Sequence, residues 1–318
     1  MLAGMTPVER VPYDEFSMFH ENAEEFGLPY DGPPTVRREA VEVEGGRHLS
    51  ALVWGDAEPE LVFLHGGAQN AHTWDTVALA LDRPLVAVDL PGHGHSDGGI
   101  GDALDPASNA RDVATAVRAL APRARAVVGM SLGGVTAIAL AAQAPELVRS
   151  LVLVDITPGV DEHKASAIVA FVNGPESFDS FDDLLARTIA FNPTRSESSL
   201  RRGILHNAAQ RDDGSWVWRY ARHRAAAPTG DQAEAEAPVV GHPQFGSLWD
   251  AMSALTMPIM LMRGMLPQSV VDDADEAELV RRCPGARVEH VAEAGHSVQG
   301  DQPVELARLI ADFVGTAA

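Results

Sequence analysis

Short runs of apolar residues, separated by segments with helical periodicity, recur through most of the chain. They lie at 61–64, 85–90, 126–130, 151–155, 258–263 and 286–291. Because these runs are apolar on both faces and alternate with helical segments, they predict a mostly parallel sheet buried between two layers of helices. The helices are expected at 72–81, 108–120, 132–143, 272–282 and 302–314.

Two further strands are expected before this pattern begins. The run V-R-R-E-A-V-E-V at 36–43 and the run H-L-S-A-L-V-W at 48–54 flank a Gly-Gly turn and predict an antiparallel hairpin. The sheet would then have eight strands. The residues before this hairpin carry Phe16, Phe19 and Phe26 among acidic residues, a pattern that predicts a short helical arm. The prolines at 29, 33 and 34 are expected to end it.

The segment 159–250 breaks the alternation of strand and helix. It has helical periodicity, several aromatic residues and no convincing strand, so we expect an inserted helical cap over the carboxyl edge of the sheet. Its polar, Ala-rich piece 225–238 predicts a loop. The predicted organisation is an N-terminal extension (1–35), an α/β core (36–158 with 251–318) and the cap.

Charge and composition limit the classes of partner. The chain has 318 residues, with 45 acidic against 24 basic side chains and a formal charge of −21. This balance argues against nucleic acid or an anionic membrane surface as partner. The absence of a basic leader and of an apolar stretch near ~20 residues predicts a cytoplasmic protein. The single cysteine, Cys283, excludes an intramolecular disulfide.

The segment V-V-G-M-S-L-G-G at 127–134 carries the candidate chemistry. It contains G-x-S-x-G between an apolar strand and an Ala-rich helix, which is the context that a nucleophile elbow requires. Ser131 would sit on the sharp turn between strand and helix. Gly129 and Gly133 would be small because the backbone is crowded there. Ser131 is therefore the predicted nucleophile.

With this motif and three others, the chain resembles the α/β-hydrolase superfamily from about residue 36 onward. The first of the three is L-H-G-G-A at 64–68, directly after a strand. The resemblance implies that the backbone N–H of Gly67, with that of Ala68 as a candidate second donor from the same loop, forms one half of an oxyanion hole. The N–H of Leu132 would form the other half and stabilise a tetrahedral intermediate.

The other two motifs contain histidines with different implied roles. In D-L-P-G-H-G-H-S-D at 89–97, His93 and His95 are expected to shape the floor of the site. In E-A-G-H-S at 293–297, the resemblance makes His296 the general base, because it follows the last strand and precedes the C-terminal helix.

The acid of the triad departs from the family pattern. The family usually places an Asp after the penultimate strand, where this chain has Pro267 and Gln268. Two alternatives stay open from the sequence. Asp155 at the end of the 151–155 strand is favoured, since some branches of the family place the acid there. The pair Asp272 and Asp273 is the other, although their place at the expected start of the 272–282 helix favours a role as N-cap and first-turn carboxylates.

Weaker signals concern the pocket. Trp74, Met130 and Ala68 are expected near the nucleophile, with core packing an equal alternative for Trp74. The aromatic residues of the cap either face a hydrophobic acyl group or hold the cap together: Phe171, Phe178, Phe181, Trp216, Trp218 and Tyr220. No metal is predicted, since His206, His223 and His242 lack ligand spacing, and no cofactor motif is present.

The predicted function is a cofactor-independent serine hydrolase acting on a small, hydrophobic carboxylic ester, lactone or thioester. Two alternatives remain. One is hydrolysis of a carbon–carbon bond by the same triad, and the other is a ligand-binding relative with little turnover, suggested by the displaced acid. The sequence leaves the oligomeric state open, with a homodimer as one outcome.

Overall fold

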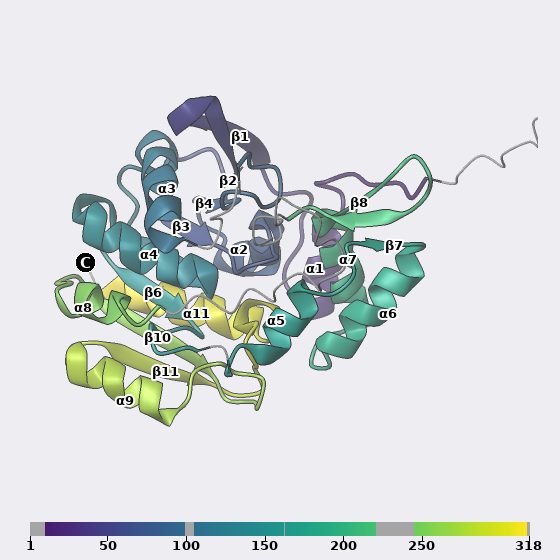
Figure 1. Cartoon of the computed structure of the whole chain (residues 1–318). Coiled ribbons are helices and arrows are strands. Elements are labelled where there is room, and N and C mark those ends of the chain that lie inside the picture. The colour runs from purple at the N-terminus through teal and green to yellow at the C-terminus, as the bar shows by residue number, and fades with distance from the viewer. Residues whose placement is uncertain (1–9, 99–104, 162, 221–244, 317–318) are drawn as a thin grey trace, which may run out of the picture.

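A single eight-stranded sheet forms the centre of the molecule (Figure 1). The computed structural model describes residues 10–98, 105–161, 163–220 and 245–316. The order of strands in the sheet is β1-β2-β4-β3-β5-β6-β10-β11. The strands are β1 (Val36–Val43), β2 (Arg47–Trp54), β3 (Leu61–Leu64), β4 (Leu85–Val88), β5 (Ala126–Met130), β6 (Leu151–Val154), β10 (Ile259–Gly264) and β11 (Arg287–Val291).

The direction of the strands matches the sequence pattern. β2 is antiparallel to both β1 and β4. The six strands from β4 to β11 in the sheet order are all parallel to one another. The predicted hairpin and the predicted parallel sheet of an α/β fold are therefore confirmed.

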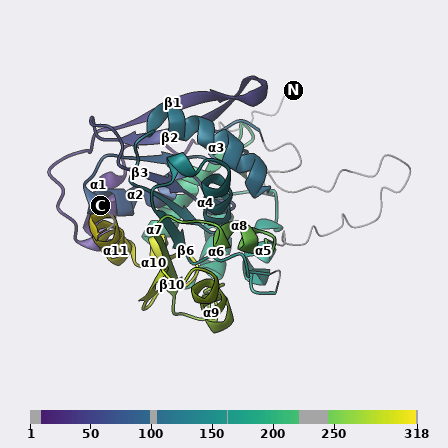
Figure 2. The same ribbon diagram turned by 90° about the vertical axis from the view of Figure 1, so that its left-hand side faces the viewer.

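Helices cover both faces of the sheet (Figure 2). One layer contains α3, α4, α8 and α9, and the other contains α1, α2 and α11. Their bounds are α1 (Phe19–Phe26), α2 (Asp75–Leu81), α3 (Pro106–Leu120), α4 (Leu132–Gln143), α8 (Leu248–Ser253), α9 (Asp273–Arg282), α10 (Val298–Asp301) and α11 (Pro303–Thr316). Short 3-10 turns are η1 (Glu44–Gly46), η2 (Ala71–Trp74) and η3 (Pro145–Leu147).

The N-terminal arm packs on the core. Phe19 of α1 is buried and meets Trp54 with ring centroids 4.9 Å apart. Asn22 donates a hydrogen bond to Thr76 Oγ1 of α2 at 2.8 Å. The helix is capped by Gly27, whose φ of 63° suits glycine, and therefore ends before the first of the prolines expected to end it.

The cap segment (residues 163–220) lies between β6 and α8. It contains α5 (Ser166–Val172), α6 (Phe181–Phe191) and α7 (Glu197–Asn207). It also contains a three-stranded sheet, which the sequence analysis missed: β7 (Ser177–Phe178), β8 (Ala208–Gln210) and β9 (Trp216–Trp218). Strands of two or three residues are too short to show an alternating pattern. The predicted loop at 225–238 lies outside the described residues.

The predicted cap boundary falls within an element. α8 begins at Leu248, before the expected end of the cap, and its Trp249 and Met252 belong to the same apolar cluster as α4. Among the described residues, no helix is both long and apolar enough to cross a membrane.

The first turn of α4 touches the end of β3. A Cβ atom at Gly133 would lie 2.2 Å from the carbonyl oxygen of Leu64 and 2.6 Å from that of His65. Backbone atoms cannot move away as a flexible side chain can. Glycine at this position is therefore a condition for seating the helix beside the strand that precedes the candidate oxyanion loop.

Gly133→Ala is expected to lower the free energy of unfolding by about 1–3 kcal/mol or more, because overpacking against backbone forces the helix to shift. Gly203→Ala is the matched control. Gly203 is inside α7 with open space where a Cβ would go, so alanine should raise stability by about 0.5–1 kcal/mol. Urea unfolding measures both. Equal stability of the wild type and Gly133→Ala would contradict the packing argument.

Candidate active site

Ser131 occupies the turn between β5 and α4. Its φ of 51° and ψ of −118° lie in a region that non-glycine residues rarely adopt. The turn is confined on the strand side as well, since a Cβ at Gly129 would lie 2.4 Å from the carbonyl oxygen of Gly133. The Ser131 side chain makes no capping hydrogen bond to α4. The hydroxyl is thus held at the start of the helix without being used to cap it.

The H-G-G loop follows β3, the strand next to β5. The buried His65 ring accepts a hydrogen bond from the Leu90 N–H at Nε2 (2.9 Å) and donates from Nδ1 to the Gly66 carbonyl (2.7 Å). Burial lowers the pKa of His65, in keeping with this neutral form. His65 therefore ties its own loop to the residue after β4, and its role is structural.

The next two residues of that loop differ in what their N–H groups do. The Ala68 N–H donates to Nε2 of the buried His93 at 3.1 Å. Because the Ala68 N–H is already used in this hydrogen bond, it is not available as the oxyanion donor that the sequence analysis had allowed. Among the described residues, no hydrogen bond is recorded for the Gly67 N–H, and Gly67 lines the cavity that contains Ser131. Gly67 and Leu132 thus stay as the predicted pair.

His296 meets Asp155, as the favoured sequence hypothesis requires. His296 Nδ1 donates to Asp155 Oδ2 at 2.9 Å, and the Asp155 side chain is 0% exposed. With Nδ1 carrying the proton, Nε2 is left with its lone pair. Nε2 is buried and has no hydrogen-bond partner among the described residues. His296 and Ser131 line the same cavity.

Three donors besides His296 hold the Asp155 carboxylate. Its Oδ1 accepts from the Gly264 N–H (2.9 Å) and the Ser269 hydroxyl (2.6 Å), and its Oδ2 also accepts from the Val270 N–H (3.0 Å). These donors stabilise a buried charge and fix its direction. The end of β10 and the loop after it therefore supply hydrogen-bond donors to Asp155, which follows β6, from the place where the resemblance had implied the acid itself.

Asp272 and Asp273 lie elsewhere. Asp272 is the N-cap of α9, where it accepts from the Asp275 N–H at 2.9 Å, and it pairs with Lys164 at 2.8 Å. Asp273 pairs with Arg263 at 2.7 Å. The structure thus joins neither residue to His296, and the alternative acid is a helix cap, as the sequence had allowed.

A cavity of about 670 Å³ lies between the core and the cap segment. Met130 and Ala68 line it, as expected. Trp74 does not line it in the described structure. Its side chain is 1% exposed and packs on Phe63 with ring centroids 4.9 Å apart, so the alternative of core packing holds.

The aromatic residues of the cap divide between the two roles proposed for them. Phe171 and Trp218 line the cavity, and their ring centroids are 5.7 Å apart. Phe181 and Trp216 instead pack against each other, with ring centroids 5.1 Å apart, within a separate apolar cluster. The cap therefore contributes apolar surface to the cavity and shares a small apolar core with Met18 of the N-terminal segment.

Comparison with known families identifies the fold. A family model described as the alpha/beta hydrolase fold matches residues 59–303. The chain belongs to the α/β-hydrolase fold family.

Curated relatives of this α/β-hydrolase cover three quarters of its length or more. Esterase Rv0045c of Mycobacterium tuberculosis is 46% identical over 95% of this chain and 96% of its own. The crystal structure of that esterase has a TM-score of 0.78 at 44% identity, over 96% of this chain and all (100%) of the other. A pimeloyl-[acyl-carrier protein] methyl ester esterase of Nitrosomonas europaea is 30% identical over 75% of this chain and 89% of its own.

The cap of this α/β-hydrolase is hydrogen-bonded to the oxyanion loop. Asn207, at the end of α7, donates to the Ala68 carbonyl at 2.6 Å. Asn70 donates to the carbonyl of His206 at 3.1 Å and to Asn207 Oδ1 at 3.2 Å. The position of α7 is thus tied to the segment that directly follows the candidate oxyanion donor Gly67.

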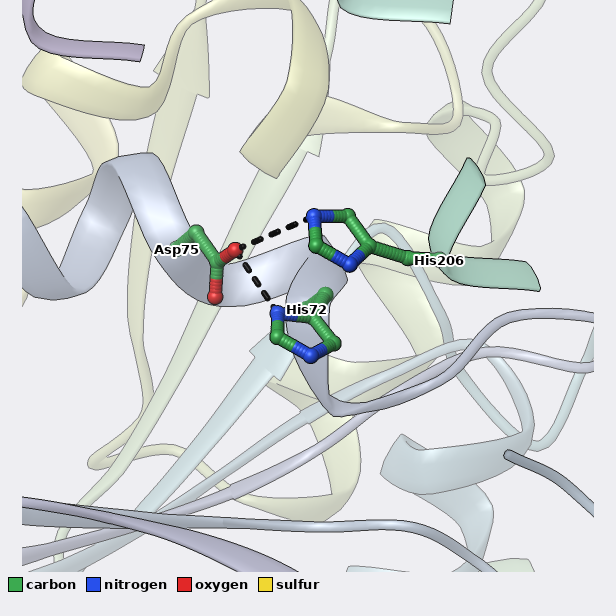
Figure 3. Close-up of side chains that lie close together, drawn as sticks. All are labelled: His72, Asp75 and His206. Carbon is green, nitrogen blue, oxygen red and sulfur yellow. Dashed lines mark hydrogen bonds and ion pairs between the residues drawn. The ribbon is translucent and has the colours of Figure 1, made fainter. Parts of the chain in front are cut away.

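Beside this contact lies a buried group of His72, Asp75 and His206 (Figure 3). Asp75 Oδ2 is 2.9 Å from His72 Nδ1 and 3.8 Å from His206 Nε2. Further contacts come from the N-terminal segment, with Glu15 3.3 Å from His72 Nε2 and the Tyr13 hydroxyl 3.0 Å from His206 Nδ1. The group therefore joins the core, the cap and the N-terminal extension.

The geometry of this group is that of an ion pair. One nitrogen of each imidazole and one carboxylate oxygen lie within 4.8 Å of one another, and zinc is commonly bound by such atoms. However, the rings of His72 and His206 are stacked, with centroids 3.7 Å apart and planes at 10°. In-plane lone pairs of parallel rings do not converge on one point, so we assign no metal. His223 and His242 lie outside the described residues.

The two stacked histidines have opposite pKa shifts. Burial would lower the pKa of His72, but the carboxylates of Asp75 and Glu15 reverse this effect and raise it to about 9. Burial and the neighbouring charge of His72 lower the pKa of His206 well below its usual value. His72 is thus the cation of the group and His206 the neutral ring.

Sequence reasoning missed this group, and for a physical reason. Its members are far apart in the chain, and the spacing of His72 and Asp75 is equally typical of a helix start. Each lone residue would more often be a solvated or packed side chain than part of a cluster.

The raised pKa of His72 predicts a pH-dependent stability. A folded-state pKa of about 9 against an unfolded value near 6.5 means that the protonated pair stabilises the fold fully below about pH 6.5. That contribution is lost as the pH rises through about 9, and it amounts to at most about 3 kcal/mol. Urea unfolding at pH 6.5 and 9.5 measures it.

His72→Gln should flatten the decline between these two pH values, because it removes the titrating group. His48→Gln is a control, since His48 is half exposed (50%) and its contact with Asp97 is 3.4 Å. A decline of the same size in His72→Gln and in the wild type would rule out His72 as its source.

Proposed function

We propose that this chain hydrolyses carboxylic esters, or similar acyl bonds, through an acyl-enzyme on Ser131. His296 acts as general base and Asp155 orients it. The observation that carries the proposal is the 2.9 Å hydrogen bond between His296 Nδ1 and the buried Asp155 carboxylate. It fixes the tautomer in which Nε2 can take a proton, within the cavity that Ser131 lines.

The proposed reaction has two halves. Ser131 Oγ attacks the ester carbonyl while His296 Nε2 takes the hydroxyl proton, and Asp155 stabilises the imidazolium. The N–H groups of Gly67 and Leu132 stabilise the oxyanion. Collapse breaks the bond to the alcohol oxygen, which receives the proton from His296. A water molecule, deprotonated by His296, then attacks the acyl-enzyme and releases the acid with Ser131 restored.

The similar proteins indicate which type of bond this protein hydrolyses. Homology to the Mycobacterium tuberculosis esterase, at 46% identity over most of the chain, makes this protein an ester-bond hydrolase of the α/β-hydrolase fold. The lining of Phe171, Phe191 and Met130 supports a substrate with an apolar part. We therefore propose a small ester with a hydrophobic acyl group.

Of the two alternative functions, the hypothesis of a ligand-binding protein with little turnover no longer has its supporting observation. That reading arose from the missing acid after β10, and Asp155 supplies a carboxylate to His296 from β6. No feature of the described structure favours carbon–carbon cleavage over ester cleavage.

Ser131→Ala should abolish release of p-nitrophenol from p-nitrophenyl esters, since the variant lacks the attacking oxygen. An acyl series from acetate to octanoate, followed by absorbance, covers the proposed substrate class. Ser269→Ala is a control with the same loss of one hydroxyl, and it should keep measurable turnover because it removes only one of the donors to Asp155. Turnover by Ser131→Ala equal to that of the wild type would refute the proposal.

Asp155→Asn should lower kcat by a factor on the order of 10⁴, because the amide no longer fixes the tautomer of His296 or stabilises its cation. Asp272→Asn makes the same change at the other candidate. Since Asn caps a helix about as well as Asp, kcat should change less than about threefold. Circular dichroism confirms that both variants are folded. A large loss in Asp272→Asn with none in Asp155→Asn would overturn the assignment.

A further inference from the structure

The cavity beside Ser131 contains one cation that differs from the others. Of the Lys and Arg side chains that line it in the described structure, Lys164 pairs with Asp272 and Asp275 at 2.8 and 2.7 Å. Arg202 pairs with Glu25. The third is Arg195, and no carboxylate lies within ion-pair distance of it among the described residues. Its recorded side-chain hydrogen bond is to the Ser199 hydroxyl.

The absence of a carboxylate partner is unusual because the Arg195 side chain is largely shielded from solvent. The side chain is partly buried, and its Nε is fully buried with no hydrogen-bond partner in the described part of the chain. Burial lowers the pKa of Arg195, with Asp301 and Glu25 acting against the shift from further away. A guanidinium without a counterion in such a place costs free energy, unless a ligand supplies the negative charge.

Arg195 also reaches the element that follows His296. It belongs to the segment between α6 and α7, and its guanidinium lies over Gly300 in α10. A Cβ on Gly300 would be 2.2 Å from Arg195 Nη1. The neighbouring Thr194 holds the same segment by donating to Asp301 Oδ1 at 2.9 Å. The cation thus crosses from the cap to the core at the wall of the catalytic cavity.

We propose that Arg195 binds a carboxylate of the substrate, at the end remote from the ester bond. The inference rests on the proposed function and adds a substrate class: esters that carry a free carboxylate. A planar guanidinium suits a planar carboxylate, with parallel N–H···O bonds. A monoanion fits better than a phosphate dianion, because Asp301 and Glu25 lie nearby and the chain carries a net charge of −21.

Matched esters test the proposal on the full-length protein. Mono-p-nitrophenyl adipate has the carboxylate on the acid part, and p-carboxyphenyl hexanoate has it on the alcohol part. The methyl ester of each carboxylate is its neutral counterpart. The measured quantity is the ratio of kcat/KM for the anionic ester to kcat/KM for the neutral one, and the pair with the larger ratio locates the carboxylate.

In Arg195→Met this ratio should fall about 10- to 100-fold, mainly through KM, which is the range for losing a charge-assisted hydrogen bond. Arg195→Lys should retain part of the preference. Arg201→Met is the matched control, since Arg201 is exposed on α7 and outside the cavity. It makes the same change in charge, and its ratio should equal that of the wild type.

An equal ratio in the wild type and Arg195→Met, or an equal fall in Arg201→Met, overturns the carboxylate site while Ser131-dependent hydrolysis of the neutral esters stands. If Ser131→Ala releases p-nitrophenol like the wild type, the proposed function fails instead. Thermal stabilisation of Ser131→Ala by monomethyl adipate, but not by dimethyl adipate, tests the site without turnover. The absence of that difference would count against Arg195.

Discussion

The closeness of α4 to the end of β3 is the constraint on which the rest of the site depends. Gly133 leaves no space for a Cβ against the carbonyls of Leu64 and His65, so the helix starts directly beside the loop that follows β3. β3 and β5 are parallel neighbours, with Leu64 opposite Gly129. The nucleophile and the candidate oxyanion donor therefore emerge side by side, and the left-handed backbone at Ser131 is the cost of that placement.

The same arrangement extends to the next strand. Ala68, Ser131 and Asp155 all have positive φ, and they follow β3, β5 and β6, which are adjacent in the sheet. The carboxyl edge of a parallel sheet is where ligands of α/β proteins bind. At Asp155 the backbone N–H donates to the Met262 carbonyl at 2.8 Å, and four donors hold the side-chain carboxylate.

How far the sequence predicts this site depends on how local each interaction is. Ser131 and His296 stand in short motifs with a fixed relation to a strand, so both could be named. Asp155 could only be favoured, because its selection rests on donors from the loop after β10, more than a hundred residues away. The cap sheet had no periodicity to detect, and the contact of His72 with His206 depends on how the cap folds back onto the core.

The cap and the catalytic loops share residues, which limits how far specificity can change without affecting chemistry. Five buried side-chain atoms without a hydrogen-bond partner in the described structure belong to residues that line this one cavity: His296, Asp75, Arg195, Arg202 and Gln299. Unpaired polar atoms lower stability, and proteins tolerate them where a ligand completes the pairing. Because Asn207 ties α7 to the Ala68 carbonyl, a cap that adapts to a new substrate also moves the backbone beside the oxyanion.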